Sequence, residues 1–400
     1  MVLGVLTGLR VTFCAFDPFP NHKGSGTRIA REVSALARAG ADIELLTLAG
    51  EGELPLPGGV AHRPLRLRED NYLARALAFR RAVAERLRAH RPDWVHVRGP
   101  FEGRAALDVG LPLLFELNGL PSVELRYHHP QVGTDRSFLQ RLVEFEREVL
   151  RGAKVWLTQS HATARFMRRV AQCSRAAEVI PNGADPAPER PAKLGSAPVR
   201  LVYAGALSPW QGLGALLPAL RDLEPDPRWT LELVGGGRRA WRTDLHRRIR
   251  ALGLKDRVVL HGAKSRAEVG ALLLGADVAL CPLRRDLRNR VQGCSPIKLF
   301  EYGAAGAAIV ASDLPCLREI FEPHEAAWSL PKRRLLRETL AQLLNEPERR
   351  DALGAAARQA VLRRHQWRHR EEALIAFYDR EVVGFPSPSG APKVSVRTSA

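Results

Sequence analysis

The chain alternates short apolar segments with amphipathic segments, and this pattern limits the folds available to it. Near the N-terminus, apolar residues 10–16 and 41–48 flank residues 27–40, whose apolar side chains recur with helical spacing. Short apolar runs are typical of buried strands, and the helical spacing is typical of a helix with one buried face. A strand, a helix and a second strand form a βαβ unit, in which the two strands lie parallel. The start of the chain therefore predicts a parallel sheet covered by helices.

The same alternation runs through both halves of the chain and is interrupted once. The interruption, ADPAPERPAKLGSAP at 184–198, is rich in Pro and Ala and has no periodic pattern, as expected of a linker. Before it we expect further strands at 93–99, 111–119, 154–160 and 178–183, with helices at 71–90 and 137–150. After it we expect strands at 199–205, 229–237, 257–262, 277–283 and 307–313, with helices at 212–220, 241–253, 266–276 and 295–306.

Four hundred residues also exceed what one hydrophobic core usually organises. We therefore predict an α/β protein with two Rossmann-like, doubly wound domains that face each other across a cleft. The predicted units are an N-terminal domain at 1–185, a C-terminal domain at 186–365, a helix at 366–383 and a disordered tail at 384–400. Ligands of such sheets bind beyond the carboxyl ends of the strands. The candidate ligand contacts there are the glycine-bearing loops at 24–26, 205 and 235–237.

The segment GCSPIKLFEYGAAG, at 293–306, carries the most specific local signal. Ser295 suits the cap of a helix and Pro296 suits its first position, while glycines suit its end. The first turn of a helix has free N–H groups and the positive end of the helix dipole, and Lys298 lies beside them. Together these groups make a site for an anion such as phosphate.

Glu301 follows Lys298 by three residues and lies on the same face of this helix. Beside a phosphate site, its carboxylate would accept hydrogen bonds from the hydroxyl groups of a sugar or a ribose. A nucleotide with an attached sugar fits this combination. The alternative is an ordinary amphipathic helix on which Lys298 and Glu301 form a surface ion pair.

The formal net charge of +18 raises the question of an anionic partner. Most of the basic residues are arginines spread through Ala- and Leu-rich helices, without a dense basic tract, an RNP aromatic signature or zinc-finger spacing. We therefore expect no nucleic acid as partner. Anionic lipid head groups and a nucleotide diphosphate both suit a basic surface, and charge alone does not choose between them.

The cysteines and the N-terminal segment bear on the cellular compartment. The five cysteines include no CxxC pair, so neither a disulfide framework nor a zinc site is expected. The apolar start, MVLGVLTGLRVTFCAF, lacks the basic region and cleavage site of a signal peptide, and no 18 apolar residues follow one another without interruption. We expect a cytoplasmic protein whose contact with the inner face of a membrane, where it occurs, is peripheral.

Seven short pieces of the sequence occur in a characteristic order and spacing. They are KGSGTRIAREVSALARAGADIELLT, PDWVHV, VIPNGAD, LVYAGALSPWQGL, LELVGGG, ADVALCP and SPIKLFEYGAAGAAIVASDLPCLRE. From about residue 10 to 380, the chain resembles the family 4 glycosyltransferases of the GT-B fold. The resemblance implies a retaining enzyme that moves a sugar from a nucleotide donor, held mainly by the C-terminal domain, to an acceptor held mainly by the N-terminal domain.

The resemblance has two further implications. It implies catalysis without a metal, because a helix N-terminus and basic side chains stabilise the departing diphosphate. It also implies that the helix at 366–383 crosses back to the N-terminal domain. Glu301 matches the second glutamate of the family's E-x7-E motif, whose carboxylate contacts the ribose. The first glutamate would fall at Gly293, so we expect Asn289 or Gln292 to replace the lost sugar contact.

A second departure concerns the diphosphate. Family members often carry an arginine and a lysine in the loop after the first strand of the C-terminal domain, where this chain has Ala206 and Gln211. We expect Lys298 and Arg290 to supply the missing charge. The other expected donor contacts are Gly205, through close backbone approach, Gln211 itself, and the segment formed by Gly293, Cys294, Ser295 and Pro296.

On the acceptor side, Asn118 falls where many family members have a histidine near the reacting centre. An amide hydrogen-bonds a hydroxyl group but cannot act as a base near neutral pH. Retaining chemistry on this fold is commonly assigned to the donor phosphate, which takes the proton of the acceptor. The remaining candidates are Glu116, Glu124, His128 and His129 on the acceptor side, and Gly24 and Gly26 in the first loop. The alternative for each acceptor-side candidate is an ordinary exposed loop or turn residue.

We therefore predict a hexosyltransferase that uses a UDP- or GDP-linked sugar, with Glu301, Lys298 and Asn118 as its catalytic groups. Its expected acceptor is a glycan, a glycolipid or a small molecule, and its expected role is cell-surface polysaccharide or glycoconjugate assembly. The departures from the family pattern leave two alternatives. One is a GT-B epimerase or phosphorylase-like enzyme, and the other is a nucleotide-sugar-binding protein without turnover.

Overall fold

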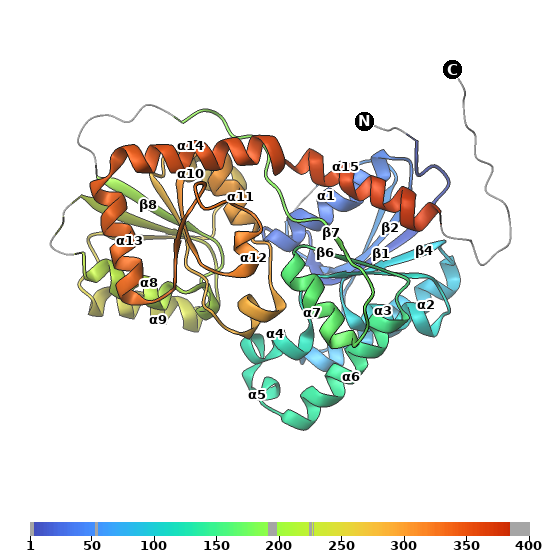
Figure 1. The fold of residues 1–400 in the computed structure, drawn as a ribbon. Coiled ribbons are helices and arrows are strands. Elements are labelled where there is room, and N and C mark those ends of the chain that lie inside the picture. The colour runs from blue at the N-terminus through green and yellow to red at the C-terminus, as the bar shows by residue number, and fades with distance from the viewer. Residues whose placement is uncertain (1–3, 53–54, 191–197, 224–225, 227, 385–400) are drawn as a thin grey trace, which may run out of the picture.

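The computed structural model describes residues 4–52, 55–190, 198–223, 226 and 228–384. Two α/β domains lie side by side, and each is built on one parallel sheet between helices (Figure 1). This arrangement confirms the predicted fold class. Residues 191–197 of the predicted linker and 385–400 of the predicted tail lie outside the described residues.

The N-terminal sheet has seven parallel strands in the order β3-β2-β1-β4-β5-β6-β7. Helices cover both faces of its central strands, so these strands are apolar almost throughout, and LLFEL in β5 is interrupted only by Glu116. Val11 pairs with Ile43 on one side and with Trp94 on the other, which places β1 between β2 and β4. The strands are β1 (Arg10–Phe19), β2 (Asp42–Ala49), β3 (Val60–Leu65), β4 (Trp94–Val97), β5 (Leu113–Leu117), β6 (Val155–Thr158) and β7 (Glu178–Val179).

Short polar side chains fix where several N-terminal helices begin. The helices are α1 (Gly24–Arg38), α2 (Tyr72–His90), α3 (Pro100–Asp108), α4 (Pro121–His128), α5 (Pro130–Gly133), α6 (Arg136–Gly152) and α7 (His161–Ala171). Asn71, Asp135 and Ser160 accept hydrogen bonds from backbone N–H groups in the first turns of α2, α6 and α7. Such caps satisfy N–H groups that have no partner inside the helix.

The C-terminal sheet has six parallel strands in the order β10-β9-β8-β11-β12-β13. The strands are β8 (Val199–Ala204), β9 (Trp229–Val234), β10 (Val258–Gly262), β11 (Val278–Cys281), β12 (Ala308–Ser312) and β13 (Ala327–Ser329). The helices are α8 (Leu213–Arg221), α9 (Arg239–Ala251), α10 (Arg266–Leu274), α11 (Ile297–Ala304), α12 (Pro315–Arg318), α13 (Arg333–Asn345) and α14 (Pro347–Arg364), with short turns η1 (Pro209–Gln211) and η2 (Arg288–Gln292). Fully buried side chains such as Trp229 and Phe300 fill the two faces of this sheet, each contributing about 1.5–3 kcal/mol.

The chain passes between the domains twice, and the two passages touch. The N–H group of Ala184 donates to the carbonyl oxygen of His365 at 3.0 Å, and the N–H group of Trp367 donates to the carbonyl oxygen of Ala184 at 3.2 Å. Gly183 permits this approach, because a Cβ atom there would lie 2.8 Å from the carbonyl oxygen of His365. The red helices α14 and α15 (Trp367–Tyr378) follow one another along the same side of both domains (Figure 1).

Helix α15 belongs to the N-terminal domain by its contacts. Phe377 and Tyr378 are part of the hydrophobic core of the N-terminal sheet. Glu371 forms ion pairs with Arg31 and Arg38 of α1. The described part of the chain therefore returns to the N-terminal domain, where the short turn η3 (Asp379–Val383) completes it.

Some elements differ from the expectations. Helix α1 begins at Gly24, so Gly24 and Gly26 lie in its first turn, and their assignment to a loop was wrong. The sequence analysis did not identify β3, β13, α3 to α5, α7 or α12 to α14. Strand β3 lies at the sheet edge with exposed and half-buried side chains, so its apolar pattern is weak. Among the residues that the structure describes, no helix is both long and apolar enough to cross a membrane.

Candidate active site

Two glycines at the carboxyl ends of neighbouring strands shape the C-terminal side of the site. Gly205 follows β8 and Gly235 follows β9, with φ angles of +144° and +145° that favour glycine. A Cβ atom on Gly235 would lie 1.8 Å from the carbonyl oxygen of Gly205, and one on Gly205 would lie 2.6 Å from Nζ of Lys298. The two strand ends therefore approach closely, and Gly205 leaves the space in which the lysine lies.

Lys298, on α11, has no charged partner in this space. Its Nζ atom donates a hydrogen bond to Oε1 of Gln211 at 2.8 Å and lies 4.1 Å from the centre of the Tyr203 ring. Within the described residues it forms no ion pair, so the alternative interpretation, a surface ion pair with Glu301, is not realised. Burial lowers the pKa of Lys298 to about 8, because desolvation disfavours the ammonium form. A bound anion would restore the missing counter-charge.

Glu301 lies one turn further along α11, where three helices begin. Its Oε1 atom is 3.9 Å from Nη2 of Arg266, and Nη1 of Arg266 donates to Oγ1 of Thr27 at 2.8 Å. A Cβ atom on Gly24 would lie 3.2 Å from Cδ1 of Ile297, so the first turns of α1 and α11 also meet. The carboxyl group is half-buried, and burial raises its pKa. Glu301 is thus held close to the place where the two domains face each other.

The start of α11 differs from the prediction. Pro296 is the cap residue, and no side chain is hydrogen-bonded to the first turn of the helix. Ser295 is buried, and its hydroxyl oxygen accepts a hydrogen bond from the N–H group of Asn182 at 3.1 Å, while the Asn182 amide donates to the carbonyl oxygen of Ser295. The assignment of Ser295 as the helix cap was therefore wrong. The serine instead joins the two domains, and the first N–H groups of α11 have no side-chain cap.

The glycine at the first position of the E-x7-E motif has a structural reason. Gly293 has a φ angle of +83°, and a Cβ atom there would lie 2.9 Å from Oγ1 of Thr163 and 3.0 Å from Cβ of Ala162. Both neighbours belong to α7 of the N-terminal domain. A glutamate at this position would require strained backbone and a shift of α7. A domain contact therefore occupies the place of the motif's first glutamate.

Neither residue proposed to replace this glutamate is placed to do so. Asn289 is fully buried, and its amide group donates two hydrogen bonds to backbone carbonyl oxygens. Gln292 is also buried, with Oε1 accepting from the N–H group of Leu120 at 2.8 Å and Nε2 donating to Glu124 at 2.7 Å. The amide groups of both side chains are engaged in hydrogen bonds within the protein, so neither is placed to contact a donor sugar.

Arg288 is a cation of this site that the sequence analysis missed. Its Nε atom donates to Oε2 of Glu124 at 2.9 Å, and its guanidinium carbon lies 5.8 Å from the centre of the Trp210 ring. Trp210 and Gln211 are adjacent in η1, so Arg288 and Lys298 contact neighbouring residues of the same short turn. Arg290, the arginine that we expected here, is exposed. The sequence RNR indicated a basic group at this point, but it did not indicate which of its two arginines faces the site.

Glu124 links the domains, so its assignment to the acceptor side was wrong. It accepts hydrogen bonds from Arg288 and Gln292 of the C-terminal domain, and its Oε2 atom lies 3.4 Å from Nε2 of His128. Burial alone would raise the pKa of Glu124, but Arg288, His128 and Gln292 lower it to about 2. The carboxylate is therefore ionised and is committed to the contact between α4 and η2.

Asn118 is the acceptor-side candidate whose side chain stays available. It follows β5, and both its Oδ1 and Nδ2 atoms are buried without a hydrogen-bond partner among the described residues. Unpaired buried amide atoms are costly, so a ligand hydroxyl that pairs with them is favoured. Two residues further on, Leu120 contacts Gln292, which leads directly into the segment 293–298. His129, by contrast, packs on the Tyr72 ring with centroids 5.3 Å apart, and burial lowers its pKa.

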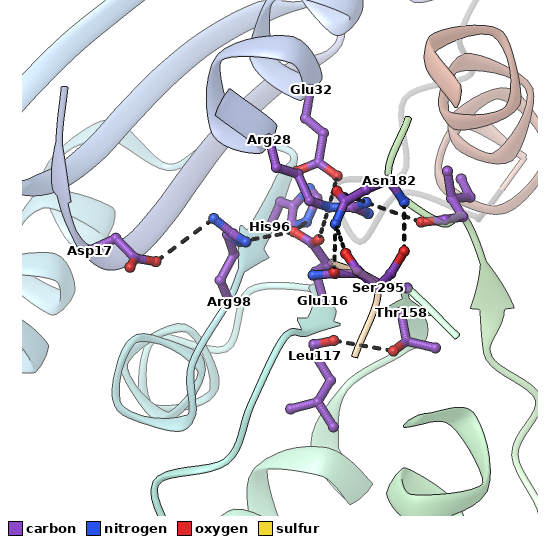
Figure 2. A network of polar contacts seen from close by, with 12 residues as sticks. Asp17, Arg28, Glu32, His96, Arg98, Glu116, Leu117, Thr158, Asn182 and Ser295 are labelled. Carbon is purple, nitrogen blue, oxygen red and sulfur yellow. Dashed lines mark hydrogen bonds and ion pairs between the residues drawn. The ribbon is translucent and has the colours of Figure 1, made fainter. Parts of the chain in front are cut away.

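Glu116 lies at the centre of a buried network of charges (Figure 2). Its Oε1 atom is 2.6 Å from Nε of Arg28, and its Oε2 atom is 3.1 Å from Nε of Arg98. Burial would raise the pKa of Glu116, but Arg28 and Arg98 hold it well below its usual range. Burial raises the pKa of the neighbouring Glu32 to about 8. Glu116 is thus fully engaged inside the domain, and its assignment to the acceptor side was wrong.

The same network reaches both the last helix and the other domain. Nδ1 of His96 lies 2.7 Å from the hydroxyl oxygen of Tyr378 on α15. Nη1 of Arg28 donates to Oδ1 of Asn182 at 3.1 Å, and Asn182 holds Ser295 of the C-terminal domain (Figure 2).

Over the described residues, no three His, Cys, Asp or Glu side chains are grouped so as to hold a metal ion.

Comparisons with known families match both halves of the chain. The model of "Glycosyltransferase Family 4" matches residues 22–188, and the model of "Glycosyl transferases group 1" matches residues 189–360. Together the two matches extend from residue 22 to residue 360, a range that includes Asn118, Gly205, Lys298 and Glu301. No curated protein sequence matches the chain.

Solved structures share the fold over nearly the whole chain. Sucrose-phosphate synthase from Thermosynechococcus elongatus has a TM-score of 0.78 at 18% identity, over 93% of this chain and 98% of that chain. WaaG, a glycosyltransferase involved in lipopolysaccharide biosynthesis, has a TM-score of 0.73 at 17% identity, over 94% and 100%. Anabaena HepE in complex with UDP-glucose has a TM-score of 0.69 at 16% identity, over 93% and 100%. At these identities the likeness establishes the common fold.

Proposed function

Because the chain belongs to the family 4 glycosyltransferases and is a glycosyltransferase of the GT-B fold, we propose that it transfers a sugar from a nucleoside diphosphate to an acceptor hydroxyl with retention of configuration. The donor binds on the C-terminal domain, around Gly205, Lys298 and Glu301. The acceptor binds on the N-terminal domain, beside Asn118. These two places adjoin, since Leu120, in the turn that follows Asn118, is hydrogen-bonded to Gln292.

The observation that carries this proposal is the unpaired ammonium group of Lys298. It lies beside the glycine-lined strand ends, close to a helix N-terminus whose first N–H groups have no side-chain cap. Such a group, paired only with the neutral amide of Gln211, favours an anionic ligand. A diphosphate fits this place, and Lys298 then takes the role of the lysine that family members carry at the position of Gln211.

Arg288 supplies the second positive charge of the proposed donor site. It contacts Trp210, next to the residue that Lys298 contacts, and Glu124 fixes its orientation. Lys298, whose charge no described carboxylate neutralises, stabilises the negative charge that develops on the departing diphosphate, and Arg288 places a guanidinium group beside the same turn. The arginine at the position of Ala206 in family members is thereby replaced from a different part of the chain, and catalysis needs no metal.

In the proposed reaction, the bond between the anomeric carbon and the diphosphate oxygen breaks, and its electron pair leaves with the diphosphate. The acceptor hydroxyl gives its proton to an oxygen of that diphosphate and bonds to the anomeric carbon on the same face. Asn118 orients a hydroxyl through its unpaired Oδ1 and Nδ2 atoms, because an amide cannot remove a proton near neutral pH. Glu301 accepts hydrogen bonds from the ribose of the donor.

A uridine diphosphate sugar is the proposed donor, since the HepE structure of the same fold contains UDP-glucose. A glycan or lipid-linked acceptor in polysaccharide or glycoconjugate assembly is supported by the likeness to WaaG, described as acting in lipopolysaccharide biosynthesis. We further propose a cytoplasmic location with peripheral contact to anionic lipid, which the net charge of +18 favours.

Calorimetric titration of the purified protein with UDP, GDP, dTDP and ADP, in buffer containing EDTA, tests the proposed donor site. We expect selective binding of UDP, and a loss of about 10-fold or more in its affinity for Glu301→Ala, because hydrogen bonds to a charged group contribute about 1.5–3 kcal/mol. Glu338→Ala is the matched control, since Glu338 is exposed on α13 and pairs only with Arg334. Its UDP affinity should equal that of the unmodified protein.

Two other outcomes of the titration would count against the proposal. If folded protein binds none of the four diphosphates, Lys298 and Arg288 do not replace the missing arginine and lysine. If UDP binds only in a parallel titration with a divalent metal ion in place of EDTA, the diphosphate charge is met by that metal ion. Incubation of the protein with UDP-glucose alone then separates transfer from the epimerase alternative, because an epimerase converts the donor without any acceptor.

A further inference from the structure

Two of the five cysteines lie side by side where the proposed donor site meets the domain contact. Sγ of Cys294, between η2 and α11, is 3.8 Å from Sγ of Cys316 on α12. Cys316 is buried, with 1% of its surface exposed, whereas Cys294 is only half-buried. Sγ of Cys316 is also 3.3 Å from the carbonyl oxygen of Asn289, which orients the thiol toward this segment. Both cysteines are free thiols, and their sulfur atoms are in direct contact.

The surroundings of the pair distinguish its two thiols. The hydrogen bond between the two sulfur atoms, together with the nearby charges of Arg288 and Lys298, lowers the pKa of Cys294 despite its burial. The same hydrogen bond and burial raise the pKa of Cys316 well above its usual range. Of the two thiols, the more accessible one on Cys294 therefore loses its proton more readily than the buried one on Cys316. A reactive thiolate next to a second thiol is the arrangement found in redox-sensitive cysteine pairs.

We propose that Cys294 and Cys316 form a reversible disulfide when the protein meets a peroxide, which makes the pair a modification site beside the donor site. The Cys294 thiolate attacks one oxygen of the peroxide, the O–O bond breaks, and a sulfenic acid forms. The Cys316 sulfur then attacks the Cys294 sulfur, and the sulfenic oxygen leaves as water with the proton of Cys316. With hydrogen peroxide, the two thiols lose two electrons and two water molecules form.

The disulfide joins two segments that both contact α7 of the N-terminal domain. Gly293, next to Cys294, packs against Thr163. Glu319, just after α12, accepts hydrogen bonds from the N–H groups of His161 at 2.7 Å and Ala162 at 3.0 Å. Sulfur atoms in a disulfide are about 2.05 Å apart, so the present 3.8 Å gap must close, and we expect the segment of Cys294, which leads into α11 and Lys298, to shift. The expected consequence, which rests on the proposed function, is weaker binding of the donor diphosphate.

Peptide mapping of the full chain tests the disulfide without any measurement of activity. Reduced protein is treated with a small excess of hydrogen peroxide, blocked with an alkylating agent and digested with trypsin without reductant. Cleavage after Arg290, Lys298 and Arg318 places the two cysteines on separate peptides, VQGCSPIK and LFEYGAAGAAIVASDLPCLR. We expect these peptides to become linked, the number of titratable thiols to fall by two, and dithiothreitol to reverse both changes.

Cys173→Ser is the matched control, because Cys173 is half-buried in the N-terminal domain and lies outside the pair. It should leave the cross-link intact, whereas Cys294→Ser and Cys316→Ser should each abolish it. Oxidation of Cys294 to a sulfinic acid without a link, or linkage of Cys294 to another cysteine, would overturn the proposal. Because the test on unmodified protein needs no variant, poor folding of Cys316→Ser does not affect it.

Titration of UDP into the oxidised and the reduced protein then measures the consequence. We expect a fall in affinity on oxidation that dithiothreitol restores. If the link forms and neither state binds UDP, the proposed donor site fails while the disulfide stands. If UDP binds equally to both states and the link is absent, the disulfide proposal fails while the donor site stands.

Discussion

On the N-terminal side of the domain boundary, Arg28 and Arg98 share the carboxylate of Glu116, with ion-pair distances of 2.6 and 3.1 Å. On the C-terminal side, Lys298 contacts the neutral amide of Gln211 and the ring of Tyr203. Both groups of cations lie near the carboxyl ends of parallel strands, where α/β sheets bind ligands. One group is neutralised from within the fold, and the other has an ammonium group left without a carboxylate among the described residues.

This difference separates two uses of buried charge. A buried ion pair adds little net stability compared with apolar residues, but it becomes strongly destabilising when one partner is lost. Removal of a cation that has no counter-charge leaves no carboxylate unpaired in the protein. Such a removal should therefore weaken the binding of an anion rather than the folded structure. The N-terminal network should therefore matter for folding, and Lys298 should matter for the ligand.

The largest expected effect is that of Glu116→Gln on stability. The substitution leaves Arg28 and Arg98 buried without an ionised carboxylate between them, and we expect a loss of about 3–5 kcal/mol in the free energy of unfolding. Urea denaturation followed by circular dichroism measures it. Glu338→Gln removes an exposed carboxylate of the same kind and should change stability by less than about 1 kcal/mol. Equal effects of the two substitutions would contradict the distinction.

Lys298→Gln should produce the reverse result. We expect the affinity for UDP to fall by about 10- to 100-fold, since a hydrogen bond from a charged group contributes about 1.5–3 kcal/mol. The free energy of unfolding should stay the same or rise, because no carboxylate loses its partner. Calorimetry and urea denaturation of the same preparation give both values, with exposed Lys332→Gln as the control. A destabilised protein with unchanged UDP affinity would refute this assignment.

Gly293→Ala tests whether the domain contact accounts for the missing glutamate. The new Cβ atom meets Thr163 at 2.9 Å in a backbone conformation with φ of +83°, so we expect a cost of about 1–3 kcal/mol in unfolding free energy. Gly270→Ala is the opposite case, because Gly270 lies inside α10 with no atom within 4 Å of its Cβ position. That control should stabilise the protein by about 0.5–1 kcal/mol. If both substitutions changed the free energy of unfolding with the same sign, the domain contact would not explain the missing glutamate.

The smallest expected effect is the pH dependence of UDP binding. The pKa of Lys298 is lowered to about 8, and the diphosphate binds the charged form. Below pH 8 the lysine is already protonated, so the affinity for UDP does not change with pH. Above pH 8 the lysine must take up a proton when UDP binds. The affinity should then fall by up to about tenfold per pH unit. Titrations between pH 7 and 9.5 measure this fall, and Lys298→Arg should flatten it, since arginine stays protonated. An affinity that rises with pH would contradict the lysine's role.

Local patterns in the sequence were sufficient for part of this picture. The alternation of strands and helices predicted both sheets, and one short segment predicted that Lys298 and Glu301 lie on one face of a short helix. These inferences depend on residues close together in the chain, where helical spacing and glycine conformation are decisive.

The incorrect assignments of Glu116, Glu124 and Ser295 involve partners that are distant in the sequence. Arg28 and Glu116 are 88 residues apart, and Glu124 and Arg288 are 164 residues apart. A glutamate at the end of a strand has the same local pattern whether it faces a ligand or a buried arginine. Only the packing of α1 and η2 against these carboxylates decides, and packing between such distant elements leaves no periodic signal in a single sequence.

The hydrogen bonds that join Ala184 to His365 and Trp367 have a mechanical consequence. Two connections fastened at one point act as a pin, so we expect the domains to move relative to each other by rotation about that point. The pin lies beside the junction of α14 and α15, whereas α4 lies on the opposite side of the molecule (Figure 1). Displacement in a rotation grows with distance from the axis. Opening should therefore leave the pin nearly still and swing Glu124 away from Arg288 over the longest arc.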